Sequence, residues 1–154
     1  MQKKPGVHDY RSMQILSSKP EKLILLLYDG AIRFIQLAIK SIESNEIEPA
    51  HKNLVKAQNI MVELMASLNF DKGGELAVNL FRIYEFMHFT LVQANIKKNP
   101  KDLARITEQL KKLRHSWNQA LKGPSDKAGG LPENEAGAAT AAGGKSAKSI
   151  TVTG

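Results

Sequence analysis

Four long amphipathic segments, separated by proline or glycine, constrain the fold of this 154-residue chain more than any other feature. Pro20, Pro49 and Pro100 each stand where an apolar segment with helical periodicity begins. Proline is tolerated in the first turn of a helix because the N–H it lacks would have no acceptor within the helix. Gly73 and Gly74 make the remaining break. The pattern predicts four helices, over residues 19–44, 47–70, 74–98 and 100–122.

The connections between these segments are short, and this decides how the helices pack. A short loop forces each helix to return beside its predecessor, so the chain is predicted to be all-α and to form an antiparallel, up-down four-helix bundle. Ser18 and Glu21 have the spacing of a capping box, and Ser18 is therefore the predicted N-cap of the first helix.

The two ends of the chain differ from the helical region between them. Residues 1–18 are polar and charged but carry apolar anchors such as Val7 and Tyr10, which indicates a short N-terminal arm. Of the 32 residues in 123–154, 14 are Gly or Ala and none is aromatic. Such a segment buries too little apolar surface to offset the entropy of ordering. We expect an arm at 1–18, a helical bundle at 19–122 and a disordered tail at 123–154.

Composition and hydropathy exclude several classes of protein. There is no cysteine, so disulfides, cysteine-ligated zinc sites and thiolate nucleophiles are impossible. The basic start of the chain is not followed by an apolar stretch of signal-peptide length. The longest apolar run, from Leu23 to Tyr28, is far shorter than the ~18 residues of a membrane-spanning helix. These features predict a soluble, cytoplasmic protein.

The first three predicted helices carry more apolar surface than a closed bundle uses: on the first, one polar face leaves most of the circumference apolar. At about 100° per residue, the second helix has two neighbouring apolar stripes, and the third is apolar nearly all round. The stripes of the second helix are Leu54, Ala57, Met61, Leu64, Met65 and Leu68, and beside them Val55, Val62 and Ala66. The surplus predicts a hydrophobic groove for a partner. Alternatively, the third helix is central and the N-terminal arm shields the rest.

Two amides lie within these apolar arcs, Gln58 on the second helix and Asn95 on the third. A buried amide that lacks a partner costs a few kcal/mol. The two could bond each other between helices, or they could bind the backbone of an extended peptide. Met61, Met65 and Met87 would give such a groove adaptable contacts, because methionine is flexible and polarizable.

Several segments occur together and in order in a way that resembles one known family. They are Tyr10, Met13-Gln14, Pro20–Leu23, Leu27–Ala31, Lys56–Ile60, Glu63-Leu64, Tyr84, Met87, Leu91 and Ala94–Ile96. The chain resembles the flagellar secretion chaperone FliS. The resemblance implies a protein that is not an enzyme and needs no cofactor. It would bind the C-terminal segment of flagellin, prevent premature polymerisation in the bacterial cytosol, and deliver flagellin to the type III export gate.

The resemblance also implies a role for the arm and suggests which residues bind the partner. In such proteins the arm covers part of the groove until the client displaces it, and Val7 and Tyr10 occupy the matching positions. An anti-sigma factor could be a second client. The predicted flagellin groove consists of Ala57, Gln58, Ile60, Met61, Leu64, Met65, Leu68, Tyr84, Met87, Leu91 and Asn95.

A di-iron bundle is a rival hypothesis, because Glu48 with His51 and Glu85 with His88 have Glu-x-x-His spacing. In an antiparallel pair of helices the two motifs would lie about 16 Å apart, so no metal site is predicted.

Binding to nucleic acid and self-association are two further hypotheses. A basic cluster could attract nucleic acid, but its residues surround a helix, which favours a solvated face. The cluster is Lys97, Lys98, Lys101, Arg105, Lys111, Lys112, Arg114 and Lys122. Under the second hypothesis, the chain is a structural bundle that homodimerises through the surplus apolar surface.

Overall fold

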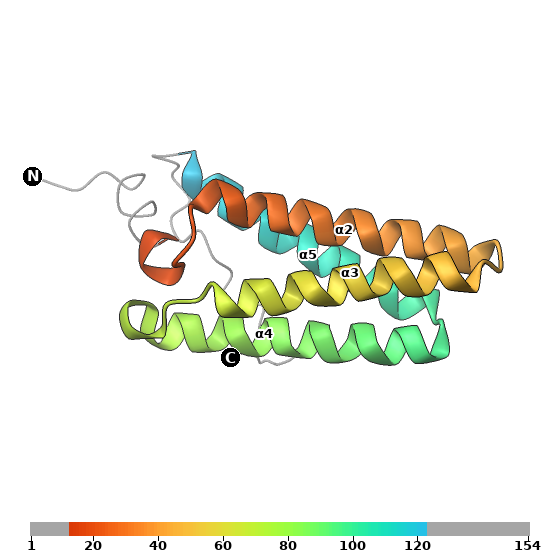
Figure 1. Ribbon diagram of the computed structural model, residues 1–154. Coiled ribbons are helices and arrows are strands. Elements are labelled where there is room, and N and C mark those ends of the chain that lie inside the picture. Colours follow the sequence, from red (N-terminus) through yellow and green to blue (C-terminus); the bar gives the residue numbers. More distant parts are fainter. Residues whose placement is uncertain (1–12, 123–154) are drawn as a thin grey trace, which may run out of the picture. The chain divides into compact units, whose positions relative to one another are not determined.

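The computed structural model describes residues 13–122 and shows four long helices preceded by one helical turn at residues 13–16. The long helices are α2 (Glu21–Glu43), α3 (Ile47–Ala66), α4 (Phe70–Lys97) and α5 (Pro100–Leu121), as labelled in Figure 1. Within the described residues, β pairing is confined to one isolated bridge between Ser17 and Leu68. The predictions for Val7, Tyr10 and the tail at 123–154 lie outside the described residues.

The described chain packs as two compact units. Residues 13–21, 67–83 and 115–122 belong to the first unit, and residues 22–66 and 84–114 belong to the second. Buried side chains lie in both units, for example Trp117 in the first and Leu54 in the second. The second contains most of the predicted partner-binding residues.

In the second unit, α2 and α3 form an antiparallel hairpin. A Cβ added to Gly30 of α2 would lie 3.1 Å from Cδ1 of Ile60 in α3, so the two helices approach closely at this level. Gly30 and Ile60 are nearly equidistant from the turn at residues 44–46, as an antiparallel pair requires. Asn95 near the end of α4 bonds His51 near the start of α3, so these two helices are also antiparallel.

The remaining contacts of this unit complete the bundle. The hydroxyls of Tyr28 in α2 and Tyr84 in α4 lie 2.6 Å apart, and both side chains are fully buried. Arg114 of α5 bonds Asp29 of α2 through both carboxylate oxygens. Because α2 and α4 both run antiparallel to α3, they are parallel to each other, and the short connection at residues 98–99 returns α5 antiparallel to α4. This confirms the predicted up-down four-helix bundle.

The chain turns sharply where α2 and α4 end. Asn45 (φ 58°) and Lys98 (φ 53°) adopt left-handed backbone conformations just after the two helices. The amide of Glu46 then donates to Ser41 O at 2.7 Å, and the amide of Asn99 donates to Ala94 O at 3.1 Å. Both ends therefore follow the Schellman pattern, with Asn and Lys in the position where glycine is commonest.

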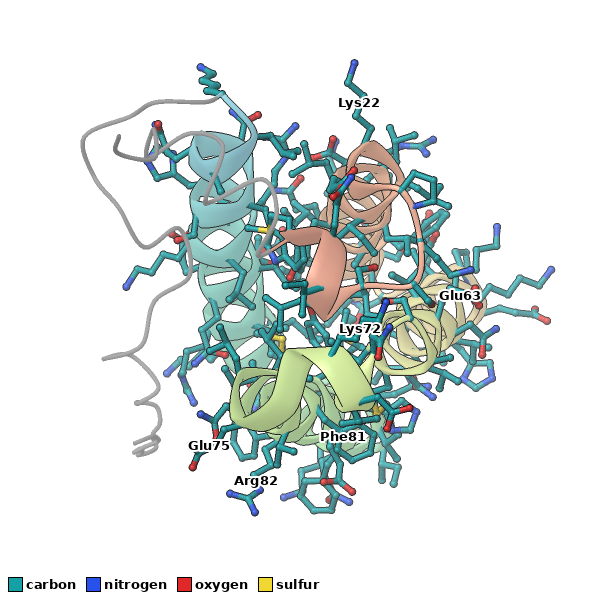
Figure 2. The ribbon with its side chains drawn as sticks, turned by 90° about the vertical axis from the view of Figure 1, so that its left-hand side faces the viewer. Lys22, Glu63, Lys72, Glu75, Phe81 and Arg82 are labelled. Atoms are coloured by element: carbon teal, nitrogen blue, oxygen red, sulfur yellow. The ribbon has the colours of Figure 1, made fainter. Side chains whose placement is uncertain are left out.

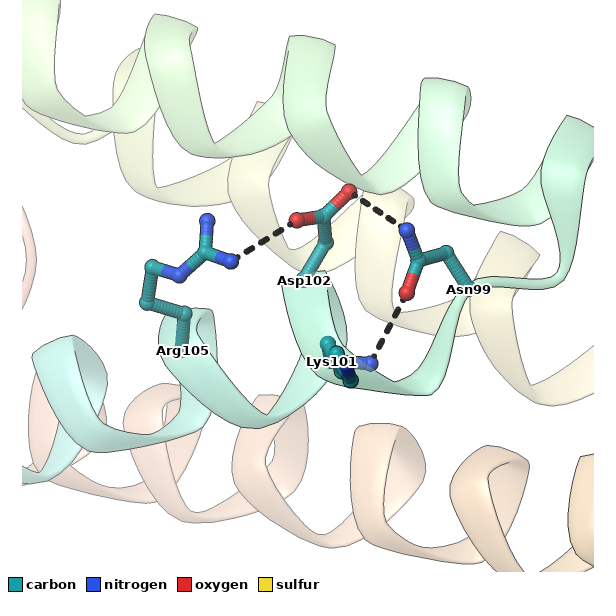
Figure 3. Close-up of polar contacts among 4 residues, drawn as sticks. All are labelled: Asn99, Lys101, Asp102 and Arg105. Carbon is teal, nitrogen blue, oxygen red and sulfur yellow. Dashed lines mark hydrogen bonds and ion pairs between the residues drawn. The ribbon is translucent and has the colours of Figure 1, made fainter.

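Asn99 also caps the N-terminus of the next helix, α5, as Figure 3 shows. Its Oδ1 accepts from the Lys101 amide at 3.0 Å, and its Nδ2 donates to Asp102 Oδ2 at 3.3 Å. Asp102 is in turn paired with Arg105 at 3.1 Å. Asparagine before the helix and Pro100 in its first turn explain why the sequence predicted the start of α5 correctly.

In the first unit, the segment before α2 is tied to the segment after α3. The Ser18 amide donates to Ser67 O at 2.7 Å, and the Asn69 amide donates to Leu16 O at 2.9 Å. Ser18 Oγ also donates to Ser67 O. The predicted capping box is therefore wrong. The helix α2 begins at Glu21, so Ser18 is not the residue next to its start. The Ser18 hydroxyl bonds Ser67 O instead.

The predicted break at Gly73-Gly74 is confirmed. Gly74 has φ 56° and ψ −135°, a conformation that residues other than glycine rarely adopt. One helical turn from Phe70 precedes it, and Phe70 packs edge-on against Phe81 with ring centroids 5.7 Å apart. Beyond the break, Glu75 and Arg82 point outward from α4 (Figure 2). None of the described helices is long and apolar enough to span a membrane.

A candidate partner-binding surface on α3 and α4

Most of the eleven predicted groove residues contribute to the core and not to the surface. Six of them have relative exposures of 0 or 1%. They are Ala57, Met61, Leu64, Tyr84, Met87 and Leu91. Asn95 is also buried, and Leu68 is a buried residue of the first unit. A partner can reach such side chains only if others move, so the accessible candidates are Gln58, Ile60 and Met65, which are half-buried.

Other apolar residues of α3 and α4, beside the buried ones, are exposed at the surface. The exposed fractions are 49% for Val62 of α3, and 61%, 59% and 71% for Phe86, Phe89 and Ile96 of α4. The sequence therefore predicted correctly that these helices have more apolar surface than the bundle hides. The residues predicted to contact the partner came mostly from the inward stripe. Composition and periodicity do not distinguish the inward stripe from the outward one. The structure shifts the candidate contacts to the outward one.

The outward residues share one side of the second unit, because helical spacing aligns them on each helix. His51 bonds Asn95 at the meeting point of α3 and α4, and the residues that follow at helical intervals line the same side. We call this surface the α3–α4 face. It consists of Val55, Gln58, Val62 and Met65 on α3, and His88, Phe89, Val92 and Ile96 on α4.

A polar network closes one end of the α3–α4 face. Asn95 Nδ2 lies 3.0 Å from His51 Nδ1, and Lys98 Nζ donates to Asn95 Oδ1 at 2.9 Å and to Asn95 O at 2.6 Å. Lys98 binds the carboxamide oxygen of Asn95, and the NH₂ group of Asn95 donates to His51 Nδ1. The sequence left open a hydrogen bond between Gln58 and Asn95. In the structure, the Asn95 carboxamide bonds His51 and Lys98 instead.

Gln58 differs from Asn95 in having an unsatisfied atom. Its Oε1 is buried and has no hydrogen-bond partner among the described residues. Burying an unpaired acceptor costs about 1–3 kcal/mol, and an incoming N–H would reach this oxygen only if neighbouring side chains moved. The sequence identified Gln58 as polar within an apolar arc, and its role in binding a partner stays a prediction.

The structure also shows the surroundings of the residues considered above for metal binding and for nucleic-acid binding. Residues 13–122 contain no group of three or more His, Cys, Asp or Glu that could hold a metal ion. On α5, Lys111 pairs with Glu108 at 3.7 Å, and a side-chain hydrogen bond with Asp29 raises the pKa of Arg114. Exposed pairs of this kind contribute little to stability.

Comparison with known proteins adds evidence of a different kind. A family model described as flagellar protein FliS matches residues 3–124. The chain belongs to the FliS family. A flagellar secretion chaperone FliS from Bacillus subtilis is 37% identical over 113 residues, which cover 73% of this chain and 84% of the relative. Its Salmonella typhimurium counterpart is 32% identical over 106 residues, covering 68% of this chain and 78% of that protein.

A more distant FliS relative, from Campylobacter jejuni, is 29% identical over 119 residues, or 77% of this chain and 93% of the relative. The FliS match begins before the described residues and ends just after them, so it includes the whole helical bundle. The family resemblance expected from the sequence is thus confirmed. FliS relatives are named as secretion chaperones, which are not a class of enzyme.

Proposed function

We propose that this FliS-family chaperone binds the C-terminal segment of flagellin on the α3–α4 face. The bound segment would be kept from polymerising in the bacterial cytosol and handed to the flagellar export gate. An anti-sigma factor is a second candidate client. No cofactor is needed for this function, because binding and release require only a reversible apolar interface.

The observation that carries this proposal is the exposure of Val62, Phe89 and Ile96 on adjacent helices. Several large apolar side chains exposed on neighbouring helices are a feature of partner sites. A segment that folds on binding typically buries about 1,000–3,000 Å² and gives up about 2–5 kcal/mol in ordering. The resulting affinity is useful but reversible, as transfer to an export gate requires.

The division of the chain follows from the same proposal. Residues 1–18 would act as an arm whose Val7 and Tyr10 cover part of the client site until flagellin displaces them. Residues 19–122 would form the chaperone domain. The predicted tail at 123–154 has no role in this proposal.

Calorimetry with the full chain and the flagellin C-terminal segment tests the site. Phe89→Asn should weaken binding at least about tenfold, because an exposed aromatic side chain that becomes buried contributes roughly 1.5–3 kcal/mol. Leu26→Asn is the matched control, since Leu26 is 64% exposed on α2 and lies outside the face. Binding that is equally strong in both variants would refute the assignment.

The alternative function, a structural bundle that homodimerises through the same surface, makes a different prediction. Sedimentation of the full chain with and without the flagellin segment separates the two. Our proposal predicts a one-to-one complex whether or not the free chain self-associates. A dimer that persists unchanged in excess segment would favour the alternative.

A further inference from the structure

A second apolar surface runs along α2, separate from the α3–α4 face. We call it the α2 stripe, and it consists of Leu23, Leu26, Gly30, Phe34 and Leu37. The spacing of three or four residues places all five on one side of the helix. The exposed fractions of Leu23, Leu26 and Leu37 are 39%, 64% and 37%. The stripe extends over about 21 Å, the length of a short helix.

One edge of the α2 stripe is formed by α3. Ile60 approaches Gly30 closely, and Lys56 Nζ lies 5.3 Å from the centroid of the Phe34 ring. Lys56 also lines a surface hollow of about 410 Å³. The other residues around the hollow are Glu48, Pro49, Lys52 and Asn53. The apolar stripe and the hollow therefore share Lys56 as a common border.

The borders of the α2 stripe are mainly basic. Lys22, Arg33 and Lys40 follow its outer edge on α2, and the Arg33 guanidinium lies 5.7 Å from the Phe34 ring centroid. Lys22 extends away from the start of the helix (Figure 2). On the α3 side, Lys52 and Lys56 provide two more positive charges.

Acidic residues near the stripe are fewer. Glu48 and Glu63 share this side of α3, and Asp29 of α2 is already bound by Arg114. A ligand for this surface therefore needs apolar side chains at helical spacing and negative charges on both flanks. Opposite charges at the rim of an interface speed association and exclude partners of the wrong sign.

We propose that the α2 stripe docks an acidic amphipathic helix of another protein. A second copy of this chain is a poor occupant, because each copy has a formal net charge of +7. Residues 1–12 are also basic, through Lys3, Lys4 and Arg11. The segment 123–154 has no net charge and no aromatic residue, so it lacks both parts of the required chemistry.

The test uses two synthetic helices of about 18 residues, long enough to match the stripe. Both have leucine at positions i, i+3, i+4 and i+7, and they differ only in having glutamate or lysine on the flanks. The full chain should bind the glutamate helix at least about tenfold more tightly than the lysine helix, and added salt should weaken that binding. Leu26→Asn should lower the affinity for the glutamate helix about tenfold, and Lys56→Glu should also lower it.

Phe89→Asn is the matched control, because it alters the α3–α4 face and should leave binding of the glutamate helix unchanged. Circular dichroism checks that each variant is folded. The proposal is overturned if neither helix binds, if both bind equally, or if Leu26→Asn has no effect. It is also overturned if the flagellin segment displaces the glutamate helix, since the stripe would then belong to the flagellin site. Failure of flagellin binding alone leaves this result unaffected.

Discussion

The carboxamide of Gln58 shows how a single residue can be costly to the free protein and useful to a complex. Its Oε1 is buried without a hydrogen bond among the described residues, while the Oδ1 and Nδ2 atoms of Asn95 each make a hydrogen bond. A structural glutamine at this position would be expected to have a partner. The unpaired oxygen is therefore the feature, at this scale, on which the proposed binding of a client to the α3–α4 face can be tested.

Replacing Gln58 by methionine tests this interpretation. Gln58→Met keeps the length of the side chain but removes the buried acceptor, so the free energy of unfolding should rise by about 1 kcal/mol. Affinity for the flagellin segment should fall, because the client loses an acceptor. Urea unfolding and calorimetry measure the two effects. A stabilised variant with undiminished affinity would show that Gln58 does not bind the client.

The hydroxyl pair of Tyr28 and Tyr84 stabilises the core of the second unit. Tyr84→Phe should lower the free energy of unfolding by about 1 kcal/mol, the usual net value of a hydrogen bond. Tyr28→Phe should do the same. Because the two hydroxyls share one bond, the double variant should lose less than the sum of the single losses. Additive losses in urea unfolding would contradict a direct bond between them.

At the scale of helices, local signals predicted some boundaries well and others poorly. Pro100 preceded by Asn99 marks the start of α5, and Gly74 marks the break in α4, because both act through their own backbone conformation. The predicted end of the second helix at residue 70 was too late, since α3 ends at Ala66. There Ser67 accepts from Ser18, a contact between distant segments that no local pattern contains.

Contacts between distant segments also explain why the sequence did not show which residues of the candidate site are exposed. On α3 the periodicity predicted two apolar stripes, but which one faces inward depends on the neighbouring helices. Val62 and Leu64 differ little in hydrophobicity, yet Val62 is 49% exposed and Leu64 is fully buried. On α2 the sequence also indicated surplus apolar surface, but it did not show which of those residues stay exposed. Only the packing of α3 against α2 leaves Leu26 outside.

The attachment of residues 13–16 depends on the lack of a side chain at Gly73. A Cβ at this position would lie 2.8 Å from Ala77 Cβ and 3.1 Å from Leu16 Cδ2. Gly73→Ala should therefore destabilise the protein by about 1–3 kcal/mol and loosen the N-terminal turn. Hydrogen exchange at the Asn69 amide, which is bonded to Leu16 O, should become faster.

Lys72→Ala is the matched control for Gly73→Ala. Lys72 is exposed and adjacent in sequence, and its backbone amide, not its side chain, makes the bond to Asn69 Oδ1. Neither stability nor exchange at Asn69 should change in this control. Equal effects of the two substitutions would show that the close approach at Gly73 is not what holds the turn.

At the scale of the whole molecule, charge separates two kinds of surface. The tail has no net charge, so the whole excess of +7 lies in residues 1–122. Within the second unit, the α3–α4 face is apolar and ends in an amide network, while the α2 stripe is bordered by lysine and arginine. The two surfaces therefore differ in chemistry, and our two proposals assign them to different partners.

The most direct test of flagellin binding on α3 and α4 is hydrogen exchange of the full chain, free and saturated with the flagellin C-terminal segment. Exchange reports the protection of each helix separately. We predict slower exchange in residues 51–65 and 88–96, together with faster exchange in residues 7–16 as the arm is displaced. Unchanged exchange in both helical ranges, with protection confined to α2 or α5, would contradict binding on this face.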